Sequence, residues 1–202
     1  MTAGRGLRVI AGSARGRRLV APKGEHTRPT ADRVKESLFS ALGPGSIVDA
    51  RVLDGYAGSG ALAIEALSRG ARAAELVESD DRAVTAIRTN LDTLGFADRG
   101  RVVKRPLLRH LTAGPGTAGP VDLVFLDPPY DTPDSDVVAV LGALIAHGWL
   151  APTARVVLER ATRAPTPDPP GWRGTWVRTF GDTLVTVLEP ERGAGSDAAP
   201  VD

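Results

Sequence analysis

One short stretch of the chain combines residue types that could do chemistry. Residues 125–130 read FLDPPY, so that an acid, two prolines and an aromatic close the apolar run VDLVF. Asp127 can accept a hydrogen bond from an amine, the prolines stiffen the backbone, and the Tyr130 ring can stack on a planar base. Because prolines cannot donate ladder hydrogen bonds, a strand that served only packing would gain little from them. The stretch therefore predicts a binding site for a planar ligand.

A glycine-rich turn earlier in the chain predicts a second part of the site. In DGYAGSG, residues 54–60, Gly58 and Gly60 let the backbone approach a ligand just before a helix. Residues 58–63 fit the G-x-G-x-x-A pattern of dinucleotide-binding turns, and Glu78 follows about 20 residues later, where a carboxylate can accept from ribose hydroxyls. Together with Asp54 these residues predict an adenosine-type ligand. They fit a nicotinamide dinucleotide and S-adenosylmethionine equally well.

FLDPPY separates these two ligands. The lone pair of an amino nitrogen on a base is delocalised into the ring, so an acceptor for its N–H protons, such as Asp127, helps the nitrogen to turn toward a methyl donor. The Tyr130 ring can hold the base at the same time. Hydride transfer needs neither group, so the stretch favours methyl transfer to a base.

The elements that must position these residues alternate between strands and helices from residue 47 onward. The predicted strands are RVLDGY (51–56), AAELVES (73–79), RVVKR (101–105), VDLVFLD (121–127) and ARVVLE (154–159). The predicted helices lie near 60–69, 81–94 and 135–147, after an earlier helix that starts at Thr30 and ends at Gly43-Pro44. This order is typical of an α/β protein with a mostly parallel, Rossmann-like sheet, whose ligands bind at the carboxyl ends of the strands.

The two ends of the chain extend this sheet. GTWVRTFGDTLVTVLEP contains two β-rich runs split by Gly181-Asp182 and predicts a C-terminal antiparallel hairpin. LRVIAG and RRLVAP, separated by SARG, predict a basic β-hairpin over residues 7–22. The tail ERGAGSDAAPVD is expected to be disordered.

Charge is distributed unevenly along the 202 residues. Residues 1–35 hold nine Lys/Arg against Glu25 and Asp32, a net +7, which leaves −6 for the rest because the whole chain is +1. A basic end on an acidic body favours a polyanionic partner, and the alternative is a solvated basic arm. The chain has no cysteine, which excludes disulfides and thiolate metal sites, and its three histidines have no metal-binding spacing. It also shows neither a signal peptide nor a membrane-spanning run, so we expect a cytoplasmic protein. We further expect a monomer that needs no metal.

Four stretches taken in order resemble one enzyme family. RVIAGSARGRRL, TRPTADRVKESLF, LDGYAGSGALAIEALSRGA and FLDPPY are similar to the bacterial 16S rRNA (guanine(966)-N2)-methyltransferases, which are class I S-adenosylmethionine-dependent methyltransferases. The resemblance covers roughly residues 7–190. It implies methyl transfer from S-adenosylmethionine to the N2 amine of one guanine, in an assembled or nearly assembled small ribosomal subunit. It also implies three parts: an RNA-binding extension (1–28), a methyltransferase domain (29–190) and a disordered tail (191–202).

The resemblance assigns expected roles to individual residues. The catalytic and base-holding residues would be Asp127, Pro128, Pro129 and Tyr130. The cofactor would contact Asp54, Tyr56, Gly58, Gly60, Glu78, Thr30 and Leu107. RNA would contact Arg8, Arg15, Arg17, Arg18, Lys23, Arg28 and Arg33. Such enzymes commonly present Asn or Asp to the adenine amine after the third strand, whereas this chain has Pro106 or Leu107 there, so backbone and apolar contacts would have to hold the adenine.

Three alternatives remain open at this point. A DNA adenine-N6 methyltransferase shares DPPY but usually carries an additional recognition domain, for which no segment here is large enough. A dinucleotide-binding oxidoreductase would leave FLDPPY and the basic end unexplained. A non-catalytic RNA-binding protein of the same fold would not need Asp127 to Tyr130.

Overall fold

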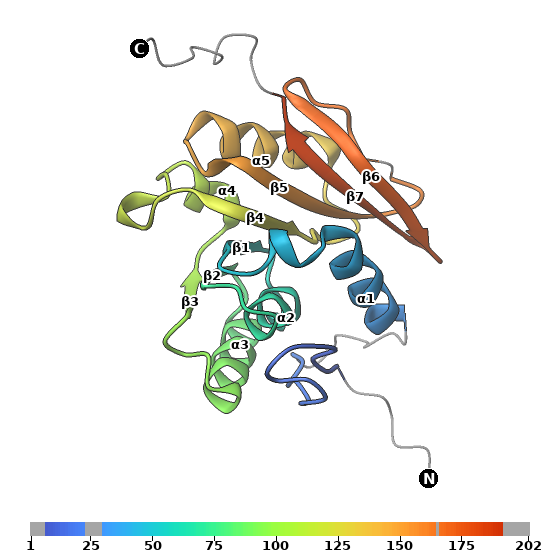
Figure 1. Cartoon of the computed structure of the whole chain (residues 1–202). Helices are drawn as coiled ribbons and strands as arrows, with labels where there is room; N and C mark the ends of the chain where they lie inside the picture. The colour runs from blue at the N-terminus through green and yellow to red at the C-terminus, as the bar shows by residue number, and fades with distance from the viewer. Residues whose placement is uncertain (1–6, 23–29, 165, 192–202) are drawn as a thin grey trace, which may run out of the picture.

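The sheet that positions the predicted site has seven strands in the order β3-β2-β1-β4-β5-β7-β6. The computed structural model describes residues 7–22, 30–164 and 166–191. The strands are β1 Arg51–Gly55, β2 Ala73–Glu78, β3 Gly100–Lys104, β4 Val121–Leu126, β5 Leu150–Ala161, β6 Trp172–Phe180 and β7 Thr183–Pro190. The first five pair in parallel, and β7 and β6 continue the sheet antiparallel. The mostly parallel sheet and its C-terminal hairpin are thus as predicted (Figure 1).

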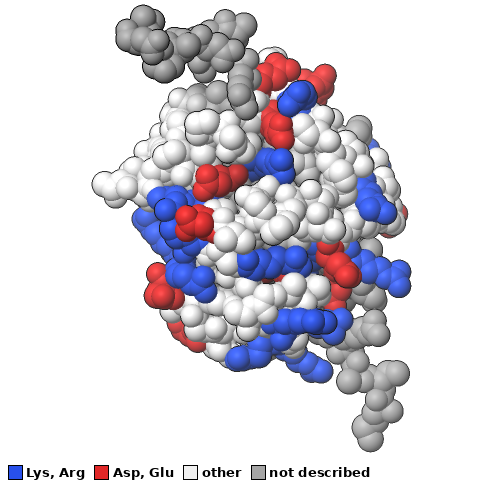
Figure 2. All heavy atoms as spheres, in the orientation of Figure 1, with Lys and Arg blue, Asp and Glu red and all other residues white. Residues whose placement is uncertain are grey.

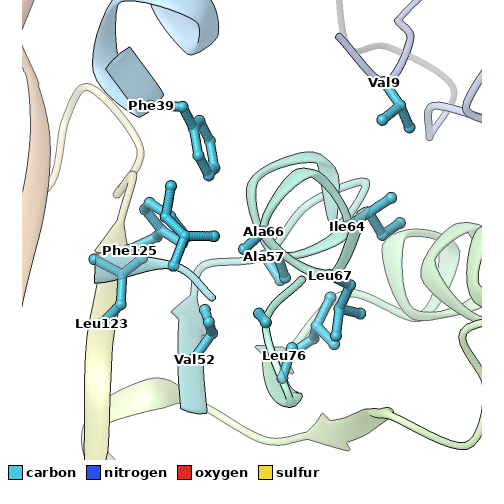
Figure 3. Packing of buried hydrophobic residues seen from close by; sticks show 14 of the residues in the cluster. Val9, Phe39, Val52, Ala57, Ile64, Ala66, Leu67, Leu76, Leu123 and Phe125 are labelled. Atoms are coloured by element: carbon cyan, nitrogen blue, oxygen red, sulfur yellow. The ribbon is translucent and has the colours of Figure 1, made fainter. Parts of the chain in front are cut away.

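Helices cover both faces of this sheet. They are α1 Thr30–Leu42, α2 Ala61–Ser68, α3 Asp81–Leu94, α4 Leu107–Leu111 and α5 Asp134–Ala146, with short 3-10 turns at Pro44–Ser46 and Gly116–Ala118. One buried cluster joins α1, α2, α3 and residues 7–19 to one face of the sheet, and a second joins α4 and α5 to the other. Strand alternation explains the division, since Phe125 belongs to the first cluster and its neighbours Val124 and Leu126 to the second. Figure 3 shows Phe39 of α1 facing Phe125, with ring centroids 5.6 Å apart.

Local signals set the ends of the helices. The Asp80 side chain accepts from the backbone N–H groups of Arg82 and Ala83 and caps α3, which ends at Gly95 with φ 73°. Gly43, with φ 70°, and Pro44 follow the last residue of α1, as predicted. Among the described residues no helix is long and apolar enough to cross a membrane.

The predicted N-terminal β-hairpin is not present as a pair of strands. Between residues 7 and 22 the structure has a single antiparallel bridge, Arg8 to Arg18. Around this bridge the Leu19 N–H donates to the Leu7 carbonyl at 2.8 Å and the Val9 N–H to the Arg17 carbonyl at 3.0 Å. The next two N–H groups, of Ile10 and Ala11, donate to the Glu65 carboxylate of α2 at 2.7 and 3.0 Å. The segment therefore turns back on itself without forming two strands, and it is docked on α2 through Glu65.

Two other elements differ from the sequence prediction. Helix α4 was not predicted; it is five residues long and is held by the Trp149 indole, which donates to the Leu111 carbonyl at 2.8 Å. Strand β5 begins at Leu150, four residues before the predicted start, because Val121 of β4 pairs with Leu150 across an irregularity in the register.

Candidate active site

The sheet brings the two chemically distinctive stretches to neighbouring strand ends. Asp54 of β1 is the register partner of Phe125 in β4, and Gly55 is the partner of Leu126. The glycine turn and Asp127 therefore leave adjacent parallel strands at the same edge. Glu78 ends β2 on the other side of β1. This is the edge at which open α/β sheets bind ligands.

The turn after β1 is tight and fixed by its own backbone. The Gly60 N–H donates to the Ala57 carbonyl at 2.7 Å, and Gly58 and Gly60 have φ of 55° and 77°. A Cβ at Gly60 would lie 3.0 Å from a Leu76 methyl group, so glycine is favoured there by both conformation and space. Tyr56 also has a positive φ, 66°, which is uncommon for a side chain of that size. The turn thus holds a strained backbone conformation at the predicted cofactor site.

Asp54 is buried beneath this turn. It is 2% exposed, and its Oδ2 accepts from the Ala63 N–H at 3.0 Å, at the start of α2. Burial raises the pKa of Asp54 to about 8; the Ala63 hydrogen bond opposes the shift, and the charges of Asp127 and Glu78 add to it. The hydrogen bond to Ala63 ties Asp54 to the start of α2, and its pKa lies well above that of an ordinary aspartate.

Glu78 connects the second strand to the glycine turn. Its Oε2 accepts from the Gly58 N–H at 2.8 Å, and its Oε1 accepts from the N–H groups of Ser79 and Asp80. The side chain is half-buried, and a carboxylate can accept more hydrogen bonds than these three. This geometry is compatible with the predicted ribose contact.

The four residues from Asp127 to Tyr130 form an outward loop after β4. Pro128 is buried, whereas Asp127 and Pro129 are exposed and Tyr130 is 40% exposed. The Thr132 N–H donates to the Pro129 carbonyl at 2.9 Å and closes a turn. An acid and an aromatic ring are thereby presented beside the glycine turn.

Arg160 was not predicted from the sequence, yet it holds this loop. It lies in β5, is 4% exposed, donates to the Thr132 carbonyl at 3.1 Å and pairs with the Asp134 carboxylate. The signal available in the sequence was an arginine that follows the apolar run VVL (156–158) by two residues. Buried arginines are rarely left without such partners.

Leu107 lies where the sequence analysis placed it, beyond the end of β3. It is buried at the start of α4, and its methyl groups are so close to Gly55 that a Cβ there would meet them at 2.7 and 2.9 Å. An apolar wall therefore stands beside the turn. Its contact with an adenine remains a prediction.

The predicted RNA-contacting arginines lie on the docked N-terminal segment and on α1. Arg15, Arg17, Arg18 and Arg33 are exposed; Arg17 donates to the Thr93 carbonyl at 2.9 Å, and Arg8 pairs with Asp32. On the face drawn in Figure 2, Lys and Arg lie over the lower part, where Figure 1 places this segment and α2, and also form a patch on the left, toward β3. Lys23, Arg28 and the side chain of Thr30 lie outside the described residues.

Comparison with known proteins gives matches that span nearly the whole chain, including both parts of the candidate site. The model of a family described as "Conserved hypothetical protein 95" matches residues 7–189. "Ribosomal RNA small subunit methyltransferase D" of Escherichia coli K12 is 38% identical over 193 residues, 95% of this chain and 94% of that protein. The protein of the same name from Haemophilus influenzae is 37% identical, over 87% of this chain and 89% of its own length. The solved structure of yhhF from Escherichia coli superposes with a TM-score of 0.80 at 36% identity, covering 92% and 98% of the two chains.

Proposed function

The chain belongs to the family described as Conserved hypothetical protein 95, and we propose that it transfers a methyl group from S-adenosylmethionine to the N2 amine of a guanine in 16S rRNA. The single observation that supports this most strongly is the side-by-side placement of the glycine turn and Asp127 on adjacent strands, β1 and β4. A cofactor at the turn and a base at Asp127 to Tyr130 would then meet at one edge of the sheet.

The residues present fit this cofactor. Glu78 offers a carboxylate for ribose hydroxyls, Leu107 offers an apolar wall for the adenine, and the turn from Tyr56 to Gly60 lets the methionine part approach the backbone. When bound, S-adenosylmethionine supplies an electrophilic methyl group on a sulfonium.

Asp127 and Tyr130 would act on the base. The half-exposed Tyr130 ring can stack on a guanine, while Asp127 accepts a hydrogen bond from its N2 amine and turns the nitrogen lone pair toward the cofactor. Once the nitrogen carries the methyl group it must lose a proton, and the exposed Asp127 can pass that proton to water. Arg160 keeps the loop in place through Thr132 and Asp134.

The remaining parts of the proposal concern the substrate and the organisation of the chain. Residues 29–190 would form the catalytic domain and residues 1–28 would contact RNA, with the substrate being an assembled or nearly assembled small subunit. The enzyme would act as a monomer in the cytoplasm. The exposed arginines of residues 7–22 support the assignment of RNA contacts to that segment.

Asp127→Ala tests the catalytic assignment. We expect methyl transfer to small subunits to fall by a factor of about 100 or more, because one oriented catalytic group is lost. Calorimetry should show nearly unchanged S-adenosylmethionine binding, since the carboxylate meets the target amine. Asp131→Ala, which removes an exposed acid four residues later, is the matched control and should keep wild-type activity. Activity of Asp127→Ala within a few-fold of wild type would remove Asp127 from the mechanism.

A further inference from the structure

A groove between α1 and the edge strand β6 lies apart from the cofactor turn. It is open to solvent, has a volume of about 430 Å³, and is lined by Arg33, Ser37 and Ser40 of α1 and by Trp176 and Arg178 of β6, among others. The lining contains two guanidinium groups and one carboxylate, that of Glu36, so its net charge is positive. Cationic groups beside an aromatic ring are the elements from which single-stranded nucleic acid sites are built.

Strand register places this groove at the catalytic edge of the sheet. Arg178 pairs with Val185 of β7, and Val185 pairs with Glu159 of β5. Glu159 is one residue beyond Leu158, the partner of Leu126. Arg178 therefore lies in the row of residues that contains Asp127, three strands away, or about 14 Å at the usual strand spacing.

The side chains on this part of β6 face α1. Trp176 and Phe180 pack against the same cluster as α1, and the Arg178 guanidinium lies 5.7 Å from the Phe180 ring centroid. One Arg178 nitrogen donates to the Ser37 hydroxyl at 3.3 Å, and the residue remains exposed. The guanidinium is thus oriented by an aromatic ring and a hydroxyl, with further N–H groups available to a ligand.

We propose that the α1–β6 groove is a second RNA-binding surface, in which Arg178 and Arg33 hold phosphates of the strand that carries the target base. The inference rests on the proposed function, because it needs an RNA substrate at Asp127. A base at Asp127 and a phosphate at Arg178 would be bound by the same edge of the sheet. The groove would then fix the path of the rRNA strand on the side opposite to β2 and β3.

Arg173 provides a matched control on the same strand. It pairs with Glu189 in the register and donates to its carboxylate at 3.1 Å, away from the groove lining. Arg178→Gln and Arg173→Gln remove the same charge from the same strand. Ser37→Glu adds a negative charge to the groove from the other wall.

The test is the binding of unmethylated small ribosomal subunits across a salt series, with S-adenosylmethionine binding measured for every variant. Arg178→Gln should weaken subunit binding about tenfold or more, and the slope of log K against log salt should fall by about 0.7–0.9 for one lost phosphate contact. Ser37→Glu should weaken binding in the same direction, and Arg173→Gln should match wild type.

Two results would overturn the inference: wild-type subunit binding by Arg178→Gln, or an equal loss in Arg173→Gln. Failure of the proposed function looks different, because the wild-type protein itself would then bind no S-adenosylmethionine or no subunits. If Ser37→Glu also lost S-adenosylmethionine binding, its effect on subunit binding would not be specific to the groove. The comparison of Arg178→Gln with Arg173→Gln would then decide whether the groove binds RNA.

Discussion

At the scale of single residues, Asp54 has the most unusual electrostatics in the site. An ordinary aspartate has a pKa of 3.8, whereas burial raises the pKa of Asp54 to about 8. The folded chain therefore keeps this proton up to about pH 8, and the unfolded chain releases it near pH 4. Between these values the folded state binds more protons than the unfolded state, so Asp54 makes the free energy of unfolding decrease as the pH rises.

Asp54→Asn should remove this pH dependence. The amide is uncharged at every pH, and its oxygen can still accept from the Ala63 N–H. Urea unfolding at pH 5 and pH 8 should show a loss of stability in the wild type of up to about 1.4 kcal/mol for each pH unit, and a smaller loss in the variant. Parallel curves for the two proteins would contradict the raised pKa.

At the scale of elements, the N-terminal segment is the least expected feature. Besides the contacts of Ile10 and Ala11 with Glu65, the buried Asn90 side chain of α3 accepts from the Val20 N–H and donates to the carbonyls of Val20 and Ser59. The segment that carries the basic residues is therefore tied, through one amide group, to the glycine turn. These bonds hold the backbone that carries its arginines close to the turn.

Two glycines of this segment offer a paired test. Gly12 and Gly16 have nearly the same conformation, with φ of 83° and 81°, but a Cβ at Gly12 would lie 1.9 Å from the Ser68 carbonyl oxygen and a Cβ at Gly16 would meet nothing within 4 Å. Gly16→Ala should cost only the left-handed strain, about 1–2 kcal/mol, or roughly 2–8 °C in Tm. Gly12→Ala should cost at least twice as much and weaken subunit binding, because it also displaces the hydrogen bond from Ser13 to Ser68.

Thermal unfolding followed by circular dichroism checks this pair. Equal Tm values for the two variants would mean that the contact between residue 12 and α2 does not support the fold.

The same segment shows where prediction from sequence stopped. Helix α3 matches its predicted bounds because its signals, the Asp80 cap and the Gly95 end, are local. The turn of the N-terminal segment is local and was predicted. Its contacts with Glu65 and Asn90 were not predicted, because these side chains lie 55 and 70 residues away and bond to backbone groups. Helix α4 was missed for a similar reason, since five residues carry little periodicity and its contact with Trp149 is distant in sequence.

The motif residues of the candidate site could be predicted from the sequence, whereas the residues and the pKa that depend on burial could not. The glycine turn and FLDPPY were recognisable by residue type, and a parallel sheet necessarily brings their strand ends to one edge. The support from Arg160 and the pKa of Asp54 depend on burial, which residue types do not reveal.

At the scale of the whole molecule, the basic residues of the N-terminal segment lie on one face of the sheet, next to the edge that carries the candidate site. Residues 1–35 carry a net +7 in a chain of net +1, and the described part of this basic region packs on the same face of the sheet as α1. The α1–β6 groove lies on that face as well. A polyanion approaching this face would meet the basic segment on one side and Arg178 on the other, with Asp127 at the sheet edge.

The most direct test of the account identifies the nucleoside that the enzyme modifies. Unmethylated small ribosomal subunits would be incubated with the protein and S-adenosylmethionine, the rRNA digested, and the nucleosides analysed by mass spectrometry, with Asp127→Ala in parallel. We predict N2-methylguanosine with the wild-type protein and none with the variant. N6-methyladenosine, or no methylated nucleoside from a wild-type protein that binds S-adenosylmethionine, would contradict the proposed function.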